Sequence, residues 1–162
     1  MASEDKSKEL HRIAVTAIIY KDGKYLITKR APTENAFPNM WTVPGGGLST
    51  DDYMSTPETH PNQWYYALEK SLRNEIREEV NLEIEKPEYL LDLTLVRPDK
   101  TPVLVLSFFA AYKSGEVKLN EDSTDFAWVS FEEAKKYDLI PGILEEIELA
   151  DKRLFKHPLP SE

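Results

Sequence analysis

The sequence predicts an α+β fold in which a mixed central sheet is covered by helices on two sides. Strand-like segments come first, one long amphipathic helix follows near the middle, and further strands and helices complete the chain. This order lacks the regular alternation of strand and helix that builds a doubly wound parallel sheet. The 162 residues suit a single domain. We expect that domain at residues 10–156, with disordered tails at residues 1–9 and 157–162.

The first predicted elements form a hairpin that leads to a run of glycines. Residues 11–20 are rich in β-branched side chains and apolar on both faces, as a central strand should be. Asp22-Gly23 supplies the left-handed positions of a tight turn, and residues 24–30 return as the second strand. After a loop with two prolines, residues 40–43 predict a short strand that ends at Pro44 and the glycines behind it.

The central part of the chain predicts a loop and then a long helix. Residues 49–63 hold two prolines and almost no aliphatic side chain, so we expect a loop or an insertion there. Residues 64–80 follow a helical pattern with an apolar side chain at every fourth position. These apolar positions are Leu68, Leu72, Ile76 and Val80.

The last part of the chain predicts three strands and two helices. The strands are expected at residues 88–96, 103–112 and 126–129. Ser130 and Glu133 have the spacing of a capping box, so a short helix is expected to begin there. Pro141 fits the first turn of a final helix that ends near Phe155.

Composition and charge narrow the class of protein. Lys and Arg total 20 against 29 Asp and Glu, which gives a formal charge of −9 and a pI near 4.9. Binding to a nucleic acid through released counterions needs clustered positive charge, so we expect no nucleic-acid partner. An acidic protein still handles a small phosphate substrate when divalent cations neutralise both partners.

The cysteine content and the hydropathy of the sequence indicate where in the cell the protein is located. The chain has no cysteine, which excludes disulfides, thiolate catalysis and Cys-based zinc sites. No apolar run is long enough to span a bilayer, and the start of the sequence lacks the apolar core of a signal peptide. We therefore expect a cytoplasmic protein without a membrane partner.

Three glutamates on the predicted helix are the first candidates for chemistry. Glu75, Glu78 and Glu79 lie one turn apart and border the apolar side of the helix rather than opposing it. Like charges at this spacing repel, and partial burial raises that cost unless a cation lies between them. Oxygen ligands of this kind suit Mg²⁺ or Mn²⁺. The alternative is a solvated acidic face, paired with Lys70, Arg73 and Arg77.

The glycines after the short strand are the second candidate. Gly45, Gly46 and Gly47 allow the backbone to approach a ligand closely. A free carbonyl in this run could join a metal shell, and bare amides could face a phosphate. The alternative is an ordinary turn, which a glycine triplet after a strand usually forms.

Taken together, these segments resemble the Nudix (MutT-like) family. Its signature runs Gly, five residues, Glu, seven residues, Arg-Glu, an apolar residue, any residue, Glu-Glu, any residue, Gly and an apolar residue. The Glu-apolar-any-Glu-Glu core matches residues 75–79, and Leu82 fills the last apolar position. The segments WTVPGG and NEDSTDFAWVSFEEA resemble the parts of the family that come before and after this core. The resemblance extends over residues 11–147, nearly the whole domain.

The sequence departs from this signature at four points. Asn74 stands in the Arg position, Asn81 in the final Gly position and Tyr66 in the first Glu position. From Gly46 to Asn74 there are 28 residues where the signature has 14, so about 14 residues are inserted. Asn tolerates a left-handed helix cap nearly as well as Gly. The metal-binding core is intact, and a non-catalytic relative stays an alternative.

The resemblance implies a Nudix-like α/β/α sandwich and a Mg²⁺-dependent hydrolase, with Mn²⁺ as the alternative ion. The implied metal ligands are the carbonyl of Gly45 and the carboxylates of Glu75, Glu78, Glu79 and Glu121. The metal would lower the pKa of a bound water, which then attacks a phosphorus atom. Glu75 or Glu121 is the implied general base, with Asp122 as the fallback.

The implied substrate is a nucleoside triphosphate or another nucleoside diphosphate derivative, bound by a monomer or a homodimer. Gly46 would face a phosphate, and Arg30 would reach one unless it is only a solvated charge at the end of a strand. Trp41 and Trp128 would stack on a base unless they belong to the core. Pro98 lies near the position where ADP-ribose-cleaving relatives carry a proline, so ADP-ribose or a nucleotide sugar is an alternative. The other alternative is a nucleotide-binding or protein-interaction domain without turnover.

Overall fold

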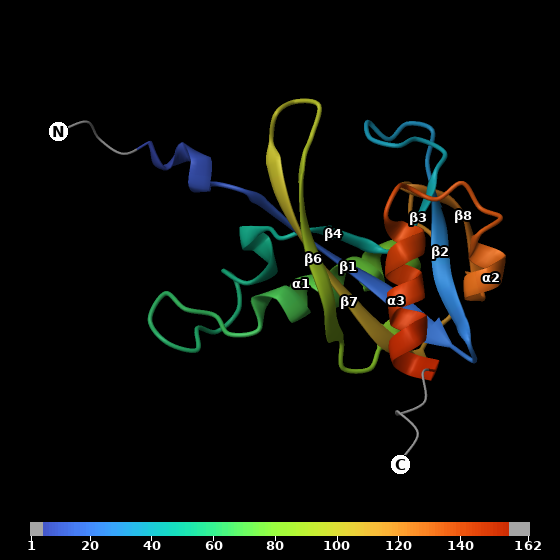
Figure 1. Ribbon diagram of the computed structural model, residues 1–162. Coiled ribbons are helices and arrows are strands. Elements are labelled where there is room, and N and C mark those ends of the chain that lie inside the picture. The colour runs from blue at the N-terminus through green and yellow to red at the C-terminus, as the bar shows by residue number, and fades with distance from the viewer. Residues whose placement is uncertain (1–4, 156–162) are drawn as a thin grey trace, which may run out of the picture.

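The computed structural model describes residues 5–155, in which a mixed sheet lies between two helices (Figure 1). Helix α3 (Ile143–Phe155) covers one face of the sheet, and α1 (Ala67–Val80) covers the other. The predicted α+β architecture is therefore confirmed. The predicted tails lie largely outside the described residues, but Lys6–Glu9 forms an exposed 3-10 helix, η1. No helix in residues 5–155 is both long and apolar enough to cross a membrane.

Strand β1 (Arg12–Lys21) lies at the centre of the sheet. Its neighbour β7 (Pro102–Ser114) runs parallel to it, from the pair Arg12–Val103 to the pair Tyr20–Ala111. On its other edge, β1 pairs antiparallel with β2 (Lys24–Arg30) and with β4 (Gly45–Gly47). The outer strands are β3 (Trp41–Thr42) and β8 (Ser123–Val129), which pair with β2, and β5 (Glu83–Ile84) and β6 (Glu88–Val96), which pair with β7.

The alternation of side chains along β1 divides the core into two layers. Val15, Ala17 and Ile19 pack against the buried side of α1, whereas Ile18 packs against α3. The buried side of α1 carries Leu72, Ile76 and Val80, with Leu68 partly buried beside them. The apolar arc predicted for this helix is therefore confirmed, and it fixes which side of α1 faces the sheet.

Both ends of α1 are set by residues in left-handed backbone conformations. Tyr66 has φ 62° and ψ 30°, so the helix begins at Ala67, three residues later than the apolar pattern predicts. Asn81 has φ 60° and donates its N–H to the Arg77 carbonyl at 3.0 Å, which ends the helix as predicted.

Several element boundaries differ from the sequence predictions. The glycine run does not end the sheet, because Gly45–Gly47 forms the strand β4 against β1. Strand β8 begins at Ser123 rather than at residue 126, and the short strand β5 was not predicted. The predicted capping box is present at helix α2 (Phe131–Ala134), where Ser130 Oγ accepts from the Glu133 amide at 3.1 Å.

Candidate active site

Two glutamates of α1 are partly buried beside β4, and the third lies on the exposed side. The Glu79 carboxylate accepts a hydrogen bond from the Gly45 N–H at 3.2 Å. Glu75 lies one turn earlier on the same side of the helix, against Gly46, while Glu78 is exposed. The pattern predicted for the three glutamates therefore orients two of them toward the glycine strand.

The hydrogen-bond ladder between β1 and β4 explains why Gly45 faces the helix. The Ala17 N–H donates to the Pro44 carbonyl at 2.9 Å, and the Leu48 N–H donates to the Ile13 carbonyl at 2.8 Å. Because bonded positions alternate in an antiparallel pair, both polar groups of Gly45 point away from β1. Its N–H reaches Glu79, and its carbonyl oxygen lies along the same edge.

The glycines of β4 leave room for charged side chains. A Cβ atom on Gly46 would lie 2.3 Å from the Glu75 carboxyl group. A Cβ atom on Gly47 would lie 2.3 Å from the Arg12 guanidinium. A larger residue at either position would displace a carboxylate or a guanidinium, each the end of a flexible side chain. At Gly45, by contrast, a Cβ atom would lie 2.2 Å from the backbone carbonyl oxygen of Val15, so this glycine is a packing requirement rather than part of an ordinary turn.

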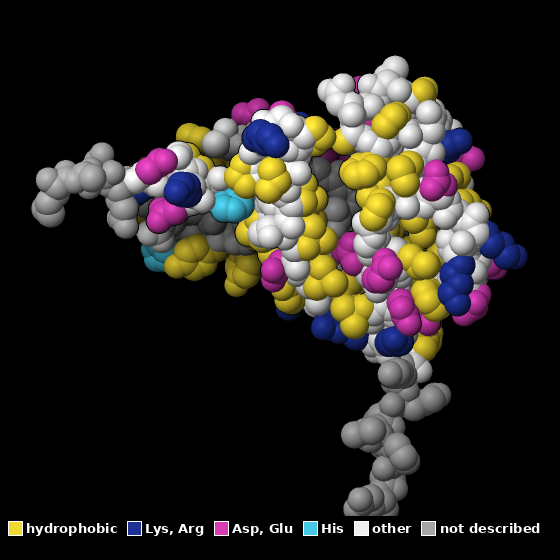
Figure 2. Space-filling view, turned by 45° about the horizontal axis from the view of Figure 1, so that its top comes forward, with side chains coloured by type: hydrophobic (Ala, Val, Ile, Leu, Met, Phe, Trp, Pro, Cys, Tyr) yellow, Lys and Arg dark blue, Asp and Glu magenta, His cyan; other side chains and the backbone are white. Residues whose placement is uncertain are grey.

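A cavity of about 200 Å³ opens beside this strand. Arg12 and Thr16 of β1 and the three glycines form one wall. Arg30 lines it from β2, Glu79 from α1, and Asp122 from the segment before β8. Figure 2 shows the surface hollowed between the β6–β7 hairpin and the part of the molecule that carries α3, with hydrophobic side chains along the hairpin.

Negative charge accumulates at the α1 side of the cavity. Burial raises the pKa of Glu79 to about 8, and the charges of Glu75 and Asp122 add to the effect. The Gly45 hydrogen bond and Arg30 act in the opposite direction. The pKa of Glu75 is also raised, first by burial and then by the charges of its acidic neighbours Glu78, Asp52 and Asp122, while Arg12 opposes the rise.

Two arginines supply positive charge to the same cavity. Arg30 is held in place by the loop that follows β2, because its Nε donates to the Ala36 carbonyl at 2.8 Å and its Nη2 to Glu34 at 3.1 Å. Arg12 lies over Gly47 and acts electrostatically on Glu75. Cations and carboxylates thus face one small space, which is an arrangement suited to a phosphate accompanied by a metal ion.

The structure brings together some of the residues predicted from the sequence and separates others. Gly45, Gly46, Glu75, Glu79 and Arg30 meet at the cavity or beside it.

Glu121 and Asp122 are both exposed, but only Asp122 lines the cavity. Trp41 packs edge-on against Tyr137 with ring centroids 4.8 Å apart, and Trp128 packs against Tyr112 at 6.2 Å. Both tryptophans pack against the core clusters and do not line the cavity. Of the two alternatives for these residues, the structure therefore favours packing in the core over stacking on a base.

Arg12 was missed by the sequence analysis. No local pattern marks it, because a single arginine at the start of a strand is common on protein surfaces. Its position over Gly47 follows from the pairing of β1 with β4, which joins segments far apart in the sequence. The signal available in the sequence was the third glycine, which has no side chain at the point where the guanidinium lies.

The donor set fits a hard divalent cation, although residues 5–155 contain no group of three His, Asp or Glu side chains already gathered around one point. The donors are carboxylate oxygens and a backbone carbonyl directed away from the ladder, which are the ligand types of Mg²⁺ and Mn²⁺. Burial and the charges of acidic neighbours raise the pKa values of Glu75 and Glu79, and a bound cation would favour the ionised forms of both.

Comparison with known proteins agrees with this fold. The model of the NUDIX domain family matches residues 10–149. A nucleoside triphosphatase, NudI from Escherichia coli, is 30% identical over 138 residues, which cover 79% of this chain and 88% of NudI.

Solved structures share the fold. A MutT NUDIX hydrolase from Burkholderia pseudomallei superposes with a TM-score of 0.69 at 19% identity, covering 86% of this chain and 98% of that one. The NUDIX domain of Shewanella oneidensis NrtR, solved with ADP ribose, has a TM-score of 0.70 at 19% identity and covers 94% of both chains.

The α/β/α sandwich is the fold of the solved NUDIX hydrolases to which this chain is similar. The chain belongs to the NUDIX domain family and is a hydrolase of that family.

Proposed function

We propose that this protein hydrolyses a diphosphate linkage in a nucleoside triphosphate and that it requires Mg²⁺, with Mn²⁺ as a substitute. The observation that carries the proposal is the placement of Glu79 and Glu75 against Gly45 and Gly46, at a cavity that Arg12 and Arg30 also reach. The name of NudI, a nucleoside triphosphatase, supports the substrate class.

The proposed ligands are the carboxylates of Glu75, Glu78 and Glu79 and the carbonyl of Gly45. When bound, Mg²⁺ supplies a more acidic water and neutralises the charge of the diphosphate. Glu78 is exposed, but its charge raises the pKa of Glu75. Its carboxylate therefore lies near enough to join the other proposed ligands after a side-chain rotation. The Gly45 N–H fixes Glu79 and thereby limits the directions from which its second oxygen binds a ligand.

Arg12 and Arg30 are proposed to bind the phosphate oxygens. Their guanidinium groups donate several hydrogen bonds to phosphate in a fixed geometry. Since Arg30 is tied to the Ala36 carbonyl and to Glu34, it loses little freedom when substrate binds. The two arginines thus orient the diphosphate, and positioning of this kind supplies much of the rate in phosphoryl transfer.

The general base is proposed to be Glu75 or Asp122. Glu75 has a raised pKa and accepts a proton more readily than an ordinary carboxylate does. Asp122 lines the cavity and acts electrostatically on both Glu75 and Glu79. Because Asp122 lines the cavity and Glu121 does not, Asp122 takes the place of Glu121 as the acidic residue proposed from the segment before β8.

ADP-ribose hydrolysis is the second candidate activity. The Shewanella NrtR domain binds ADP ribose, and it shares the fold of this chain. Pro98 adds no support, because it lies in the exposed turn between β6 and β7. Binding of a nucleotide or a protein without turnover is the remaining alternative.

A nucleotide panel tests these alternatives. Nucleoside triphosphates, ADP-ribose and nucleotide sugars are incubated with the protein in Mg²⁺, in Mn²⁺ and in EDTA, and phosphate and pyrophosphate are measured separately. We expect release from at least one nucleoside triphosphate that EDTA abolishes and Mg²⁺ restores. Faster cleavage of ADP-ribose would select the second candidate. Tight nucleotide binding without release of either product would show a domain that does not turn over.

The location and assembly of the protein are part of the same proposal. We propose a cytoplasmic monomer or homodimer that acts on small nucleotides and has no nucleic-acid or membrane partner. The formal charge of −9 supports the absence of a polyanion partner. Light scattering on the purified protein, with and without an oligonucleotide, gives its mass and tests this point.

A further inference from the structure

A chain of three hydrogen-bonded side chains leads from helix α3 across the sheet to the cavity. The Ser107 hydroxyl on β7 donates a short hydrogen bond to Oε1 of Glu146 on α3. The Thr16 hydroxyl on β1 donates to Ser107 Oγ at 3.1 Å. Ser107 and Glu146 are only 1% and 6% exposed, whereas Thr16 is half-buried and lines the cavity. Ser107 and Glu146 are therefore enclosed within the protein, whereas Thr16, at the end of the hydrogen-bonded series, reaches the proposed substrate site.

The fold places these three residues in line. Thr16 and Ser107 are direct partners in the parallel ladder of β1 and β7, so their side chains leave the sheet on the same face. Helix α3 covers this face and brings Glu146 to Ser107. Figure 1 shows α3 crossing in front of β7 and β1. The chain is thus built by elements that are fixed in the core.

The direction of the hydrogen bonds follows from what each group is able to donate. An ionised carboxylate only accepts hydrogen bonds, so the Ser107 hydroxyl donates its single hydrogen to Glu146. Ser107 Oγ then accepts from Thr16, whose single proton is used in turn. Thr16 therefore offers the cavity a lone pair and no free proton.

The ionised form of Glu146 sets this direction. Burial raises the pKa of Glu146, and the hydrogen bond from Ser107 opposes that rise. The charge of Glu145 also raises the pKa of this carboxyl.

We infer that Thr16 determines specificity by selecting nucleotides that carry an N–H or O–H group at this point, and that Ser107 and Glu146 are positioning residues that act through Thr16. The inference rests on the proposed function, because it takes the cavity as the nucleotide site. A phosphate oxygen only accepts, so it does not bind here, and the hydrogen-bonded group belongs to the nucleoside. Sites that hydrogen-bond a substrate group reject analogues that lack it, because a buried polar atom is then left unpaired.

Equilibrium binding of matched nucleotides tests this inference without turnover. Methylene-bridged, non-hydrolysable nucleotides are compared in pairs that differ by one donor: ribose against 2′-deoxyribose, adenine against purine, and guanine against hypoxanthine. For at least one pair, the wild-type protein should bind the member with the donor about tenfold more tightly or better. Thr16→Val removes the hydroxyl at nearly constant volume and should reduce that preference to about threefold or less. Thr16→Ser should keep it.

Variants of the buried residues separate positioning from packing. Ser107→Ala frees the Thr16 proton, so Thr16 is able to donate or to accept and the preference should shrink. Glu146→Gln introduces donors that are able to reverse the chain, whereas Glu145→Gln changes an exposed neighbour and should leave the preference intact. Circular dichroism melting checks each fold, and the Thr16 variants decide the matter if a buried variant does not fold.

The outcomes separate this inference from the proposed function. A donor preference that survives in Thr16→Val, or the absence of any preference in the wild-type protein, overturns the role of Thr16. Hydrolysis accompanied by either result leaves the proposed function in place. A preference that depends on Thr16, in a protein that hydrolyses no nucleotide, supports the inference and contradicts the proposed function.

Discussion

Gly45 and Glu79 are joined across 34 residues by a hydrogen bond of 3.2 Å from the glycine N–H to the carboxylate. This bond connects β4 to α1 and fixes one oxygen of the most deeply buried glutamate of the site. It also lies at the junction of the two patterns that stand out in the sequence, the glycine run and the glutamate helix. The predicted effects of substitutions at Gly46 and Glu79 depend on how closely β4 and α1 approach each other.

The close approach of β4 and α1 predicts a specific effect of a methyl group at Gly46. In Gly46→Ala the new Cβ would lie 2.3 Å from the Glu75 carboxyl group, so Glu75 must move. We expect a loss of about 1 kcal/mol in the free energy of unfolding, at the low end for an overpacked site, because the displaced group is the end of a flexible side chain. In a Glu75→Ala background the same substitution should be nearly neutral. Equal losses in both backgrounds, measured by urea unfolding, would show that Glu75 is not the group displaced.

The raised pKa of Glu79 predicts how stability depends on pH in the absence of metal. The carboxyl titrates at about 8 in the folded protein against 4.5 when unfolded, so the folded state binds the extra proton between these values. Stability should therefore fall as the pH rises from about 4.5 to about 8, and Glu75 contributes with the same sign. Glu79→Gln should melt several degrees higher than wild type at about pH 8 in EDTA and little higher at about pH 4.5. A melting difference that is the same at both pH values would contradict the burial of an ionisable group at this position.

Asn74 occupies the position of the arginine in the family signature, and we expect it to be replaceable. It accepts a hydrogen bond from Arg77 Nη1 at 3.3 Å on the partly exposed side of α1, away from the cavity. Asn74→Arg should therefore keep the rate within about threefold and leave the metal requirement unchanged, as for a surface substitution. Steady-state kinetics over a series of Mg²⁺ concentrations check this. Complete loss of activity would mean that the helix is not registered as the signature aligns it.

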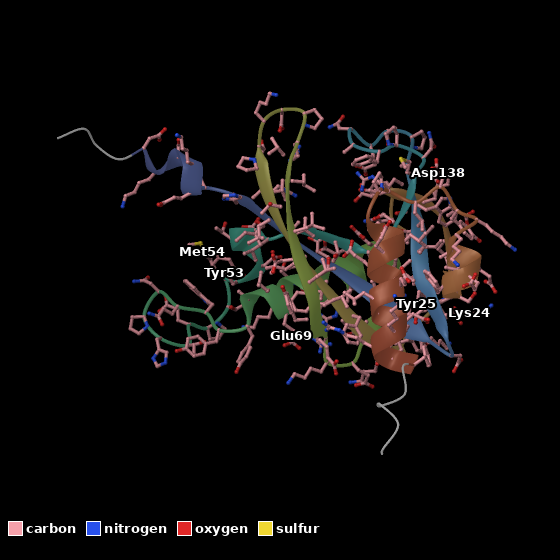
Figure 3. All side chains as sticks on the ribbon, viewed as in Figure 1. Lys24, Tyr25, Tyr53, Met54, Glu69 and Asp138 are labelled. Carbon is pink, nitrogen blue, oxygen red and sulfur yellow. The ribbon has the colours of Figure 1, made fainter. Side chains whose placement is uncertain are left out.

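A hydrogen bond attaches the insertion to the active-site helix, and most of the residues that follow it are exposed. Asp52 Oδ2 accepts from Ser71 Oγ at 3.0 Å, one turn before Glu75, and from the Ser49 N–H at 2.8 Å. Beyond Asp52, Tyr53 packs on Trp64 at 5.3 Å, and Trp64 Nε1 donates to the Thr56 carbonyl at 3.0 Å. Figure 3 shows Tyr53 and Met54 beside α1, on the side away from α3.

Shortening this loop should change how substrate binds and spare the metal requirement. Residues 54–61 are replaced by a short Gly-Ser link, which keeps Asp52 and its contact with Ser71. We expect a change of about threefold or more in KM, or a new substrate ranking, because loops beside a site shape access to it. An unchanged KM and an unchanged ranking would show a tolerated surface insertion, since lengthening a loop costs little entropy.

The parts of the site that local spacing determines were predictable from the sequence. The helical period predicts that Glu75 and Glu79 lie on the same side of the helix. The glycines indicate a backbone that another group approaches closely. Both residues of the Glu79–Gly45 contact were therefore identified from the sequence. The contact itself, and Arg12, depend on the pairing of β1 with β4, which no local pattern contains. The glycine run was expected to end a strand, although its residues form one.

A one-residue shift separates the predicted acidic residue from the one that reaches the cavity. Glu121 and Asp122 precede β8, whose pairing with β2 changes register between Lys29 and Arg30. Counting back from Trp128 does not account for such an irregularity, so spacing favoured Glu121. Trp41 and Trp128 were ambiguous for another reason, because the same aromatic surface fills a core or stacks on a base.

The central claim is that Glu79 holds the metal that hydrolysis requires, and turnover of Glu79→Gln tests it most directly. The substitution removes one charge at nearly constant volume, and Glu116→Gln on the exposed surface is the matched control. With the best nucleotide at saturating Mg²⁺, we expect kcat to fall by about 100-fold or more in Glu79→Gln and to stay at the wild-type value in the control. A kcat for Glu79→Gln close to that of the wild-type protein, in a variant that melts as a folded protein, would contradict the assignment of this site.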